Sequence, residues 1–222
     1  MTDSDDWAAA EQRVLAEALN IAPRHGWTWL TVKAAGRAAG FSPADVELLL
    51  PQGPADLAAL LSRRHDRLAM VALRGVDPLS LKIRERIARA VEARLDAAFI
   101  DETALRHWVG WLALPLNLPL ALKLLWESAD QLWRWAGDVA TDENHYSKRA
   151  ILAGILAGAL AIRLTSNAGA ARRFLDARIQ NAMSYEKWKA GVRPGEGLRD
   201  LVQALARLRY GRAPTPAEEP AA

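Results

Sequence analysis

Four histidines and no cysteine define the reactive chemistry open to this sequence. Without cysteine there are no disulfides, thiolate nucleophiles or cysteine-ligated zinc sites. Asp142 and His145 have the three-residue spacing of a carboxylate–histidine metal pair, but a di-iron bundle requires two such pairs and further carboxylates. The sequence has no P-loop, GxGxxG, GxSxG or HExxH motif. We therefore predict no catalytic residue, no metal site and no cofactor, and a protein that is not an enzyme.

Apolar side chains are concentrated in the middle of the chain. Five of the nine tryptophans lie between Trp108 and Trp135, and the stretch from Trp108 to Leu125 contains a single charged residue, Lys123. A helix that is apolar around most of its circumference is either enclosed or lines an apolar cavity. Ordinary core packing is the alternative; we predict a bulky hydrophobic ligand. The candidate lipid-binding residues are Trp108, Trp111, Leu112, Leu114, Leu122, Leu125, Trp126, Trp133, Ile151 and Ile155.

The elements that must position these residues are helices. The hydrophobic period is helical throughout and no strand alternation is evident, which predicts an all-α protein of about ten helices. We expect them at about 6–23, 32–39, 43–50, 54–73, 78–99, 101–113, 119–136, 144–164, 168–190 and 198–210. Thr31 is expected to cap the second helix, and Ser42 with Asp45 the third. In the fifth helix we expect Arg94 on the solvated face.

The longest uncharged apolar run covers residues 150–162, which is shorter than the roughly 20 residues that cross a bilayer. We therefore expect no transmembrane helix, and the acidic start of the chain predicts no signal peptide. Gly154 and Gly158 would let another helix approach this run closely. Internal helix packing and a homodimer interface are both compatible with that spacing.

Charge is distributed unevenly along the chain. The net charge is +3, but residues 1–60 carry four basic against eight acidic residues, so the remainder carries +7. The last predicted helix is amphipathic and basic, which suits an anionic membrane surface, although it could also pack on its own core. Its candidate membrane-binding residues are Leu198, Leu201, Val202, Leu205, Leu208, Arg199 and Arg209. Residues 213–222, rich in proline and alanine, are expected to be disordered.

Residues 30–42, LTVKAAGRAAGFS, with the short helix that follows, resemble the helix-turn-helix of TetR-type proteins. The second helix of such a unit enters the major groove and needs basic or hydrogen-bonding side chains. Here it carries Asp45 and Glu47, and no lysine or arginine occurs between Ala38 and Ser62. Because phosphate contacts supply most non-specific affinity, we predict that this unit does not bind DNA.

Three further stretches carry a second resemblance: LALPLNLPLALKLLW at 112–126, AGDVATDENHYSKRAILAG at 136–154 and FLDARIQNAM at 174–183. With these residues the chain resembles the COQ9 family of ubiquinone-biosynthesis accessory proteins. The resemblance implies a TetR-like fold without DNA binding, a homodimer, an apolar pocket for isoprenoid quinone intermediates and partnership with the demethoxyubiquinone hydroxylase. It places the partner-binding residues at Asp142, Asn144, Tyr146, Lys148 and Arg149. Glu143 and His145 depart from the family, which often has an aromatic residue and a tryptophan there.

These observations predict four segments: residues 1–53 as a helix-turn-helix-like unit, 54–192 as a lipid-binding and dimerisation domain, 193–212 as an amphipathic membrane helix, and 213–222 as a tail. The expected function is that of a lipid-binding accessory protein that takes quinone intermediates from the membrane and presents them to the hydroxylase. Its expected location is the cytoplasmic face of a bacterial inner membrane, or the matrix side in a mitochondrion. The alternatives are a TetR-type ligand-responsive transcriptional regulator and a carrier of some other apolar ligand.

Overall fold

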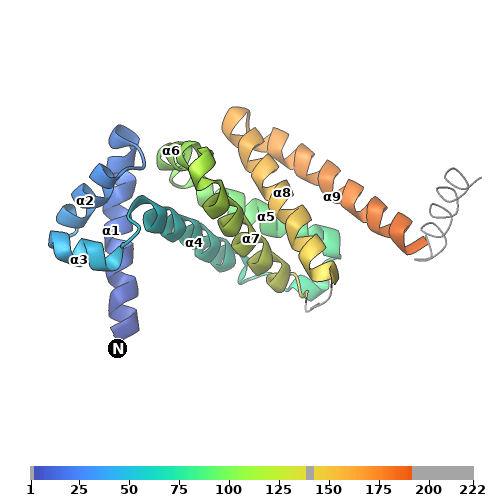
Figure 1. The fold of residues 1–222 in the computed structure, drawn as a ribbon. Helices are drawn as coiled ribbons and strands as arrows, with labels where there is room; N and C mark the ends of the chain where they lie inside the picture. Colours follow the sequence, from blue (N-terminus) through green and yellow to red (C-terminus); the bar gives the residue numbers. More distant parts are fainter. Residues whose placement is uncertain (1–2, 139–142, 192–222) are drawn as a thin grey trace, which may run out of the picture. The chain divides into compact units, whose positions relative to one another are not determined.

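The computed structural model describes residues 3–138 and 143–191, which form nine α-helices, two short 3-10 turns and no strand (Figure 1). The all-α prediction is confirmed for these ranges. Of the described residues, those up to 179 form one compact unit, and residues 180–191 belong to a second. The elements are α1 (Asp3–His25), α2 (Trp29–Ala38), α3 (Pro43–Leu49), α4 (Pro54–Leu73), η1 (Pro78–Ser80), α5 (Ile83–Phe99), α6 (Glu102–Leu112), η2 (Pro115–Asn117), α7 (Leu118–Trp135), α8 (Glu143–Thr165) and α9 (Ala168–Gly191).

The helix α2 begins earlier than the sequence predicts. Thr28, in extended conformation, is its N-cap, and the Thr28 side chain accepts a hydrogen bond from the Thr31 backbone N–H. The prediction that Thr31 caps this helix is therefore wrong. Thr31 is instead fully buried in the first turn, where its hydroxyl donates to the Gly26 carbonyl at 2.7 Å.

The turn from α2 to α3 has the geometry of a helix-turn-helix. Gly40 has φ +83°, a conformation that side chains with a Cβ rarely adopt, and a Cβ on Gly36 would lie 2.1 Å from Val46 Cγ2. The predicted capping box at the start of α3 is confirmed, because the Ser42 N–H donates to Asp45 Oδ2 and the Asp45 N–H donates to Ser42 Oγ. This unit is consistent with the expected TetR-like helical protein.

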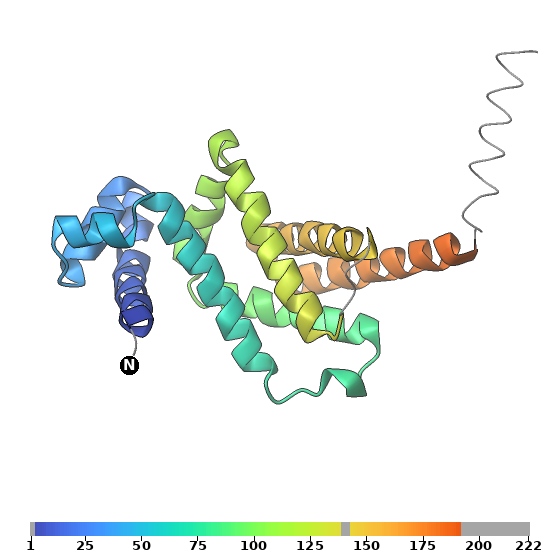
Figure 2. The same ribbon diagram turned by 60° about the horizontal axis from the view of Figure 1, so that its bottom comes forward.

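The helix α4 connects the first three helices to the rest of the unit (Figure 2). One hydrophobic cluster joins α1–α4 to α6 and the start of α7, and it includes Leu15, Leu57 and Leu105. Trp108 in α6 is a buried member of this cluster and donates its indole N–H to the Ala58 carbonyl of α4 at 3.1 Å. A second cluster gathers α5, the end of α7, α8 and the first turns of α9.

The helix predicted from residue 78 is interrupted. Residues 78–80 form η1, and α5 starts only at Ile83, where the Lys82 N–H donates to Glu85 Oε2 at 3.1 Å. The predicted solvent position of Arg94 is also wrong. Arg94 is 5% exposed, because it lies three residues after the buried Val91 and forms an ion pair with Asp66 of α4.

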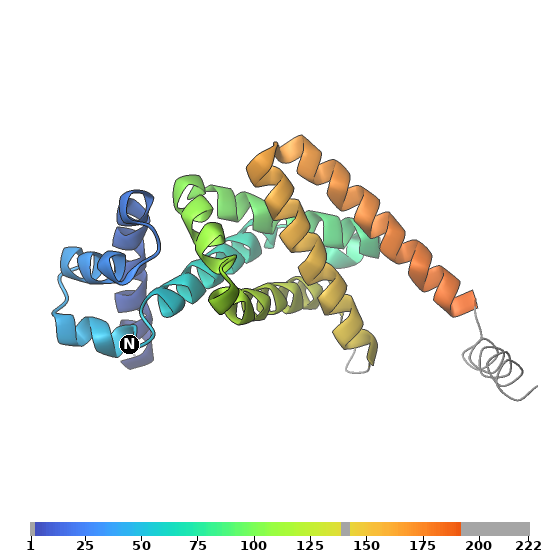
Figure 3. The same cartoon turned by 45° about the horizontal axis from the view of Figure 1, so that its top comes forward.

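Between α6 and α7 the chain bends sharply at η2 (Figure 3). In the described part of the chain, no helix alone is long and apolar enough to cross a bilayer, and only Glu102–Leu112 taken together with Pro115–Trp135, bent by 93°, passes that test. Pro115 and Pro119 flank this bend, as expected for residues that cannot continue a hydrogen-bonded helix interior.

The two glycines of α8 have different surroundings. A Cβ on Gly158 would lie 2.7 Å from the Phe174 ring of α9, so Gly158 permits helix packing within the chain. Gly154 is exposed and no atom lies near its missing side chain, and its place in a dimer interface stays a prediction. The predicted membrane helix at 198–210 and the tail at 213–222 lie outside the described residues.

Candidate lipid-binding cavity and polar surface

An apolar cavity of about 250 Å³ lies among α4, α5, α6, α7 and α8. Its apolar lining is Leu95, Trp108, Val109, Leu112, Ala113, Leu118, Ala121, Leu124, Leu125, Leu156, Ala157, Leu160 and Ala161, and its polar lining is Ser62, Arg94 and Ser128. A larger hollow beside α5 has several charged lining residues, including Arg89, Glu92 and Asp176. The smaller cavity therefore fits an apolar ligand better.

The three polar lining residues belong to one buried hydrogen-bonded cluster, which we call the polar floor: Ser62, Asp66, Arg94 and Ser128. Arg94 Nε donates to Asp66 Oδ1 at 2.5 Å, and Ser128 Oγ donates to the same oxygen at 2.8 Å. Arg94 Nη2 lies 3.4 Å from Ser62 Oγ. The guanidinium and the carboxylate neutralise each other, which makes burial of both charges tolerable.

A second polar group lies next to the floor. His65 is fully buried, with its ring edge-on to Trp108, and neither ring nitrogen has a hydrogen-bond partner. Burial, together with the positive charges of Arg94 and Arg64, lowers the pKa of His65 to about 2. The imidazole is therefore neutral in the folded protein at any physiological pH.

Three of the ten predicted lipid-binding residues line the cavity: Trp108, Leu112 and Leu125. Ile155 is buried in the second hydrophobic cluster, and Ile151 is exposed on α8. Trp111 packs against the first cluster, and its carbonyl accepts a hydrogen bond from the Asn117 side chain.

The other four predicted lipid-binding residues lie elsewhere on α7 and the bend before it. Trp126 stacks on Tyr146, and the Trp133 indole N–H donates to the Lys148 carbonyl at 3.0 Å. Both tryptophans therefore join α7 to α8. Leu114 and Leu122 are exposed, and neither lines the cavity.

An exposed apolar surface, which we call the leucine turn, surrounds the bend at η2. Its members are Leu114, Leu116, Leu118 and Leu122, and Leu116 is 94% exposed. Leu118 also lines the cavity, so the turn adjoins the cavity wall. No charged residue occurs between His107 and Lys123, and exposed leucines this close together in the sequence are typical of a region that binds a partner or a membrane.

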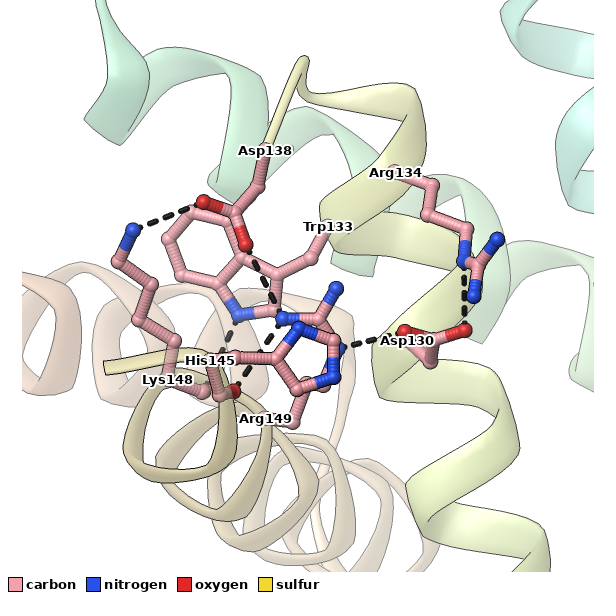
Figure 4. A network of polar contacts seen from close by, with 7 residues as sticks. All are labelled: Asp130, Trp133, Arg134, Asp138, His145, Lys148 and Arg149. Carbon is pink, nitrogen blue, oxygen red and sulfur yellow. Dashed lines mark hydrogen bonds and ion pairs between the residues drawn. The ribbon is translucent and has the colours of Figure 1, made fainter. Parts of the chain in front are cut away.

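Arg149 lies at the centre of an ion-pair network between α7 and α8 (Figure 4). Its Nε contacts Asp130 Oδ1 at 2.5 Å, its Nη1 contacts Asp138 Oδ2 at 3.0 Å, and Nη1 also donates to the His145 carbonyl. Arg149 is 1% exposed. The expectation that its side chain faces a partner is therefore corrected: both aspartates hold the guanidinium inside the fold.

The two aspartates of this network are stabilised as anions. Burial alone would raise the pKa of Asp130, but hydrogen bonds from Arg149 and Arg134 outweigh it and hold that pKa below its usual value. Burial likewise opposes ionisation of Asp138, and hydrogen bonds from Lys148 and Arg149 lower its pKa. Opposite charges at hydrogen-bonding distance thus override the desolvation of both carboxylates.

Of the predicted partner-binding residues, Tyr146 is exposed and Lys148 is half-buried. Lys148 Nζ bonds Asp138 Oδ1 at 2.8 Å and lies over the Trp133 ring. Asp142 lies outside the described residues, as does the side chain of Asn144. The spacing of Asp142 and His145, from which no metal site was predicted, cannot be examined for the same reason. Among the side chains that are described, no three histidines, aspartates or glutamates gather as metal ligands.

The residues of the polar floor were missed by sequence reasoning. One signal was available: Ser62 and Asp66 are four residues apart on α4, beside the buried Leu61 and Ala69, so both point into the core. Arg94 falls in the apolar stripe of its helix by spacing, three residues after Val91. A buried arginine therefore required a buried carboxylate, and Asp66 supplies it.

Comparison with known proteins adds to this geometry. The fold places the chain in the class of all-α proteins that enclose a mainly apolar cavity among their helices. Residues 118–186 match the family model COQ9. The relatives include the ubiquinone biosynthesis protein COQ9, mitochondrial, of Rattus norvegicus, which is 30% identical over 82% of this chain and 62% of its own length.

Two further relatives support the same assignment. The ubiquinone biosynthesis protein COQ9-B, mitochondrial, of Xenopus laevis is 31% identical over 82% of this chain and 66% of its own length. The ubiquinone biosynthesis protein coq9, mitochondrial, of Schizosaccharomyces pombe is 28% identical over 81% of this chain and 72% of its length. The chain belongs to the COQ9 family. It spans less than two thirds of the length of the rat relative.

Proposed function

We propose that this chain is a non-catalytic, lipid-binding accessory protein of ubiquinone biosynthesis. The observation that carries the proposal is the apolar cavity beside the leucine turn, within a member of a family whose relatives are named for ubiquinone biosynthesis. The protein takes up an isoprenoid quinone intermediate and presents it to the demethoxyubiquinone hydroxylase. The ligand enters beside the leucine turn, where apolar side chains are already exposed.

The remaining parts of the proposal concern where the protein works. The basic helix predicted at 198–210 docks on an anionic membrane surface, so the protein lies peripherally on the bacterial inner membrane, or on the matrix side of the mitochondrial one. The surface around Tyr146 contacts the hydroxylase, and the exposed face of α8 around Gly154 joins two copies in a homodimer.

Transcriptional regulation is the less well supported of the two candidate functions. The surface of α3 that would face DNA carries Asp45 and Glu47, both exposed. Hydrogen bonds from the Ser42 side chain and backbone lower the pKa of Asp45, so this carboxyl is ionised at neutral pH. Two anionic side chains at the position that reads the major groove oppose DNA binding.

The test is organic extraction and mass spectrometry of lipid that co-purifies with the full chain. We expect a quinone or an isoprenoid phenol at near-stoichiometric amounts. Ala121→Trp fills the cavity, so its lipid content should fall at least several-fold, whereas Ala8→Trp on the exposed surface of α1 should leave it unchanged. Phospholipid alone, or the same lipid content in both variants, would contradict the proposal.

A further inference from the structure

The cavity is amphiphilic, and its polar atoms are not scattered. Only three of its lining residues are polar, Ser62, Arg94 and Ser128, and all three belong to the polar floor. They come from three different helices, α4, α5 and α7. An apolar ligand would gain nothing from such a group. A ligand with a polar end, by contrast, would form hydrogen bonds with the polar floor. These bonds would replace part of the hydration that the polar end loses on burial.

The floor has no net charge to offer an ionic ligand. Arg94 is paired with Asp66. The neighbouring Arg64 lies 3.4 Å from Asp101, and His65 between these groups is neutral in the folded protein. A carboxylate or phosphate head would therefore be buried without an uncompensated cation to pair with, which is costly. The charge balance favours an uncharged head.

Hydrogen bonding within the floor leaves both a donor and an acceptor. Ser128 Oγ donates its proton to Asp66, so its lone pairs remain able to accept. Ser62 Oγ accepts from Arg94 Nη2, so its own proton remains able to donate. A carbonyl or ether oxygen on a ring would accept from Ser62, and a ring hydroxyl in a reduced ligand would donate to Ser128.

The size of the cavity sets the orientation of the ligand. A volume of about 250 Å³ is below the roughly 300–1,000 Å³ typical of ligand pockets, so it encloses a substituted ring and the first part of a chain, but not a polyprenyl tail. The tail must leave the cavity past Leu118, which lines the cavity and belongs to the exposed leucine turn.

We infer that Ser62, Arg94 and Ser128 form a head-group subsite that selects an uncharged, oxygenated ring and holds it inward, with the apolar tail emerging at the leucine turn. This inference rests on the proposed lipid-binding function and adds to it the residues that determine specificity.

The test compares three probes with the same ten-carbon chain: decylubiquinone, decylbenzene and decanoate. Isothermal titration calorimetry on the full chain should show that decylubiquinone binds at least tenfold more tightly than either of the others. The Ser62→Ala/Ser128→Ala variant should lose about tenfold in affinity for decylubiquinone and keep its affinity for decylbenzene. Ser166→Ala, an exposed serine, should change neither affinity.

Unchanged decylbenzene binding shows that the variant's cavity is intact. Should the double variant not fold, Ser62→Ala alone replaces it, because its contact with Arg94 is the longest in the floor. The same quinone preference in wild type and variant, or a preference for decanoate, would overturn the subsite while leaving lipid binding intact. Failure of the wild type to bind any of the three probes would instead overturn the proposed function itself.

Discussion

Two arginines, Arg94 and Arg149, are buried in the described core, and aspartates from other segments of the chain neutralise both. Arg94 contributes a polar end to the cavity, whereas Arg149 ties α8 to the end of α7. A buried ion pair contributes little net stability, but removing one partner leaves an uncompensated charge in the core. The two arginines are therefore sensitive positions for different reasons.

Arg149→Met leaves Asp130 and Asp138 without their central partner. We expect a loss of about 3–5 kcal/mol in the free energy of unfolding, measured by urea denaturation. Arg134→Met is the matched control, because Arg134 also pairs with Asp130 but has a mostly exposed side chain, and it should cost less than about 1 kcal/mol. Equal losses in the two variants would show that burial of Arg149 does not determine its importance.

His65 should make stability depend on pH in a window of its own. Its pKa is about 2 in the folded protein and about 6.5 in the unfolded chain, so below pH 6.5 only the unfolded chain gains this proton. As the pH decreases below 6.5, the free energy of unfolding should therefore decrease, by up to about 1.4 kcal/mol per pH unit from this residue. The lowered pKa values of Asp130 and Asp138 place their own loss of stabilisation below about pH 4.

His65→Leu removes the proton acceptor without breaking a hydrogen bond, since neither ring nitrogen has a partner. Denaturation between pH 6.5 and 4.5 should show a flatter dependence than in wild type. His107→Gln, a change at an exposed histidine, should keep the wild-type slope. A slope that is the same in all three proteins would mean that His65 does not titrate as its burial implies.

Among the elements, the leucine turn has the clearest experimental consequence. Leu116 is almost fully exposed, so Leu116→Asp should leave the fold intact while placing a charge on the surface that adjoins the cavity. We expect flotation with anionic liposomes to fall several-fold. Leu79→Asp, at another exposed leucine, should float like wild type.

Leu201→Asp tests the predicted C-terminal helix in the same assay, and we expect it to abolish flotation, because a carboxylate on the apolar face opposes insertion into the interface. Unchanged flotation of Leu201→Asp would contradict membrane docking by that helix. Unchanged flotation of Leu116→Asp would restrict the leucine turn to a contact with protein or ligand.

Some features of the helices could be predicted from the sequence, and others could not. Helical periodicity and local capping predict the helices and the Ser42–Asp45 capping box, because these depend on residues a few positions apart. The burial of Arg94 and the internal position of Arg149 depend on partners 11 or more residues away in the sequence, and the interruption at η1 depends on how the chain enters a helix. Trp126 and Trp133 were predicted to bind lipid for their apolar character, but tertiary contacts commit them to the α7–α8 interface.

At the scale of the whole molecule, the proposed contact with the hydroxylase depends on a small exposed surface. Tyr146 is 63% exposed and stacks on Trp126, so its ring is held in place without being buried. Tyr146→Ala should weaken capture of the hydroxylase in a pull-down by at least several-fold, with little change in the unfolding midpoint. Ser166→Ala, an exposed residue just after the far end of α8, serves as the control. Undiminished capture by Tyr146→Ala would remove this surface from the proposed interface.

The size of the cavity also bears on how a ligand would move between membranes. Each methylene left in water costs about 0.8 kcal/mol, so a long tail that the cavity cannot enclose would strongly oppose release of the loaded protein into the aqueous phase. A carrier of this kind exchanges its cargo during collisions with a bilayer rather than by free diffusion. The transfer rate between donor and acceptor vesicles should then rise with vesicle concentration, as in collisional transfer, instead of reaching a plateau set by dissociation of the lipid.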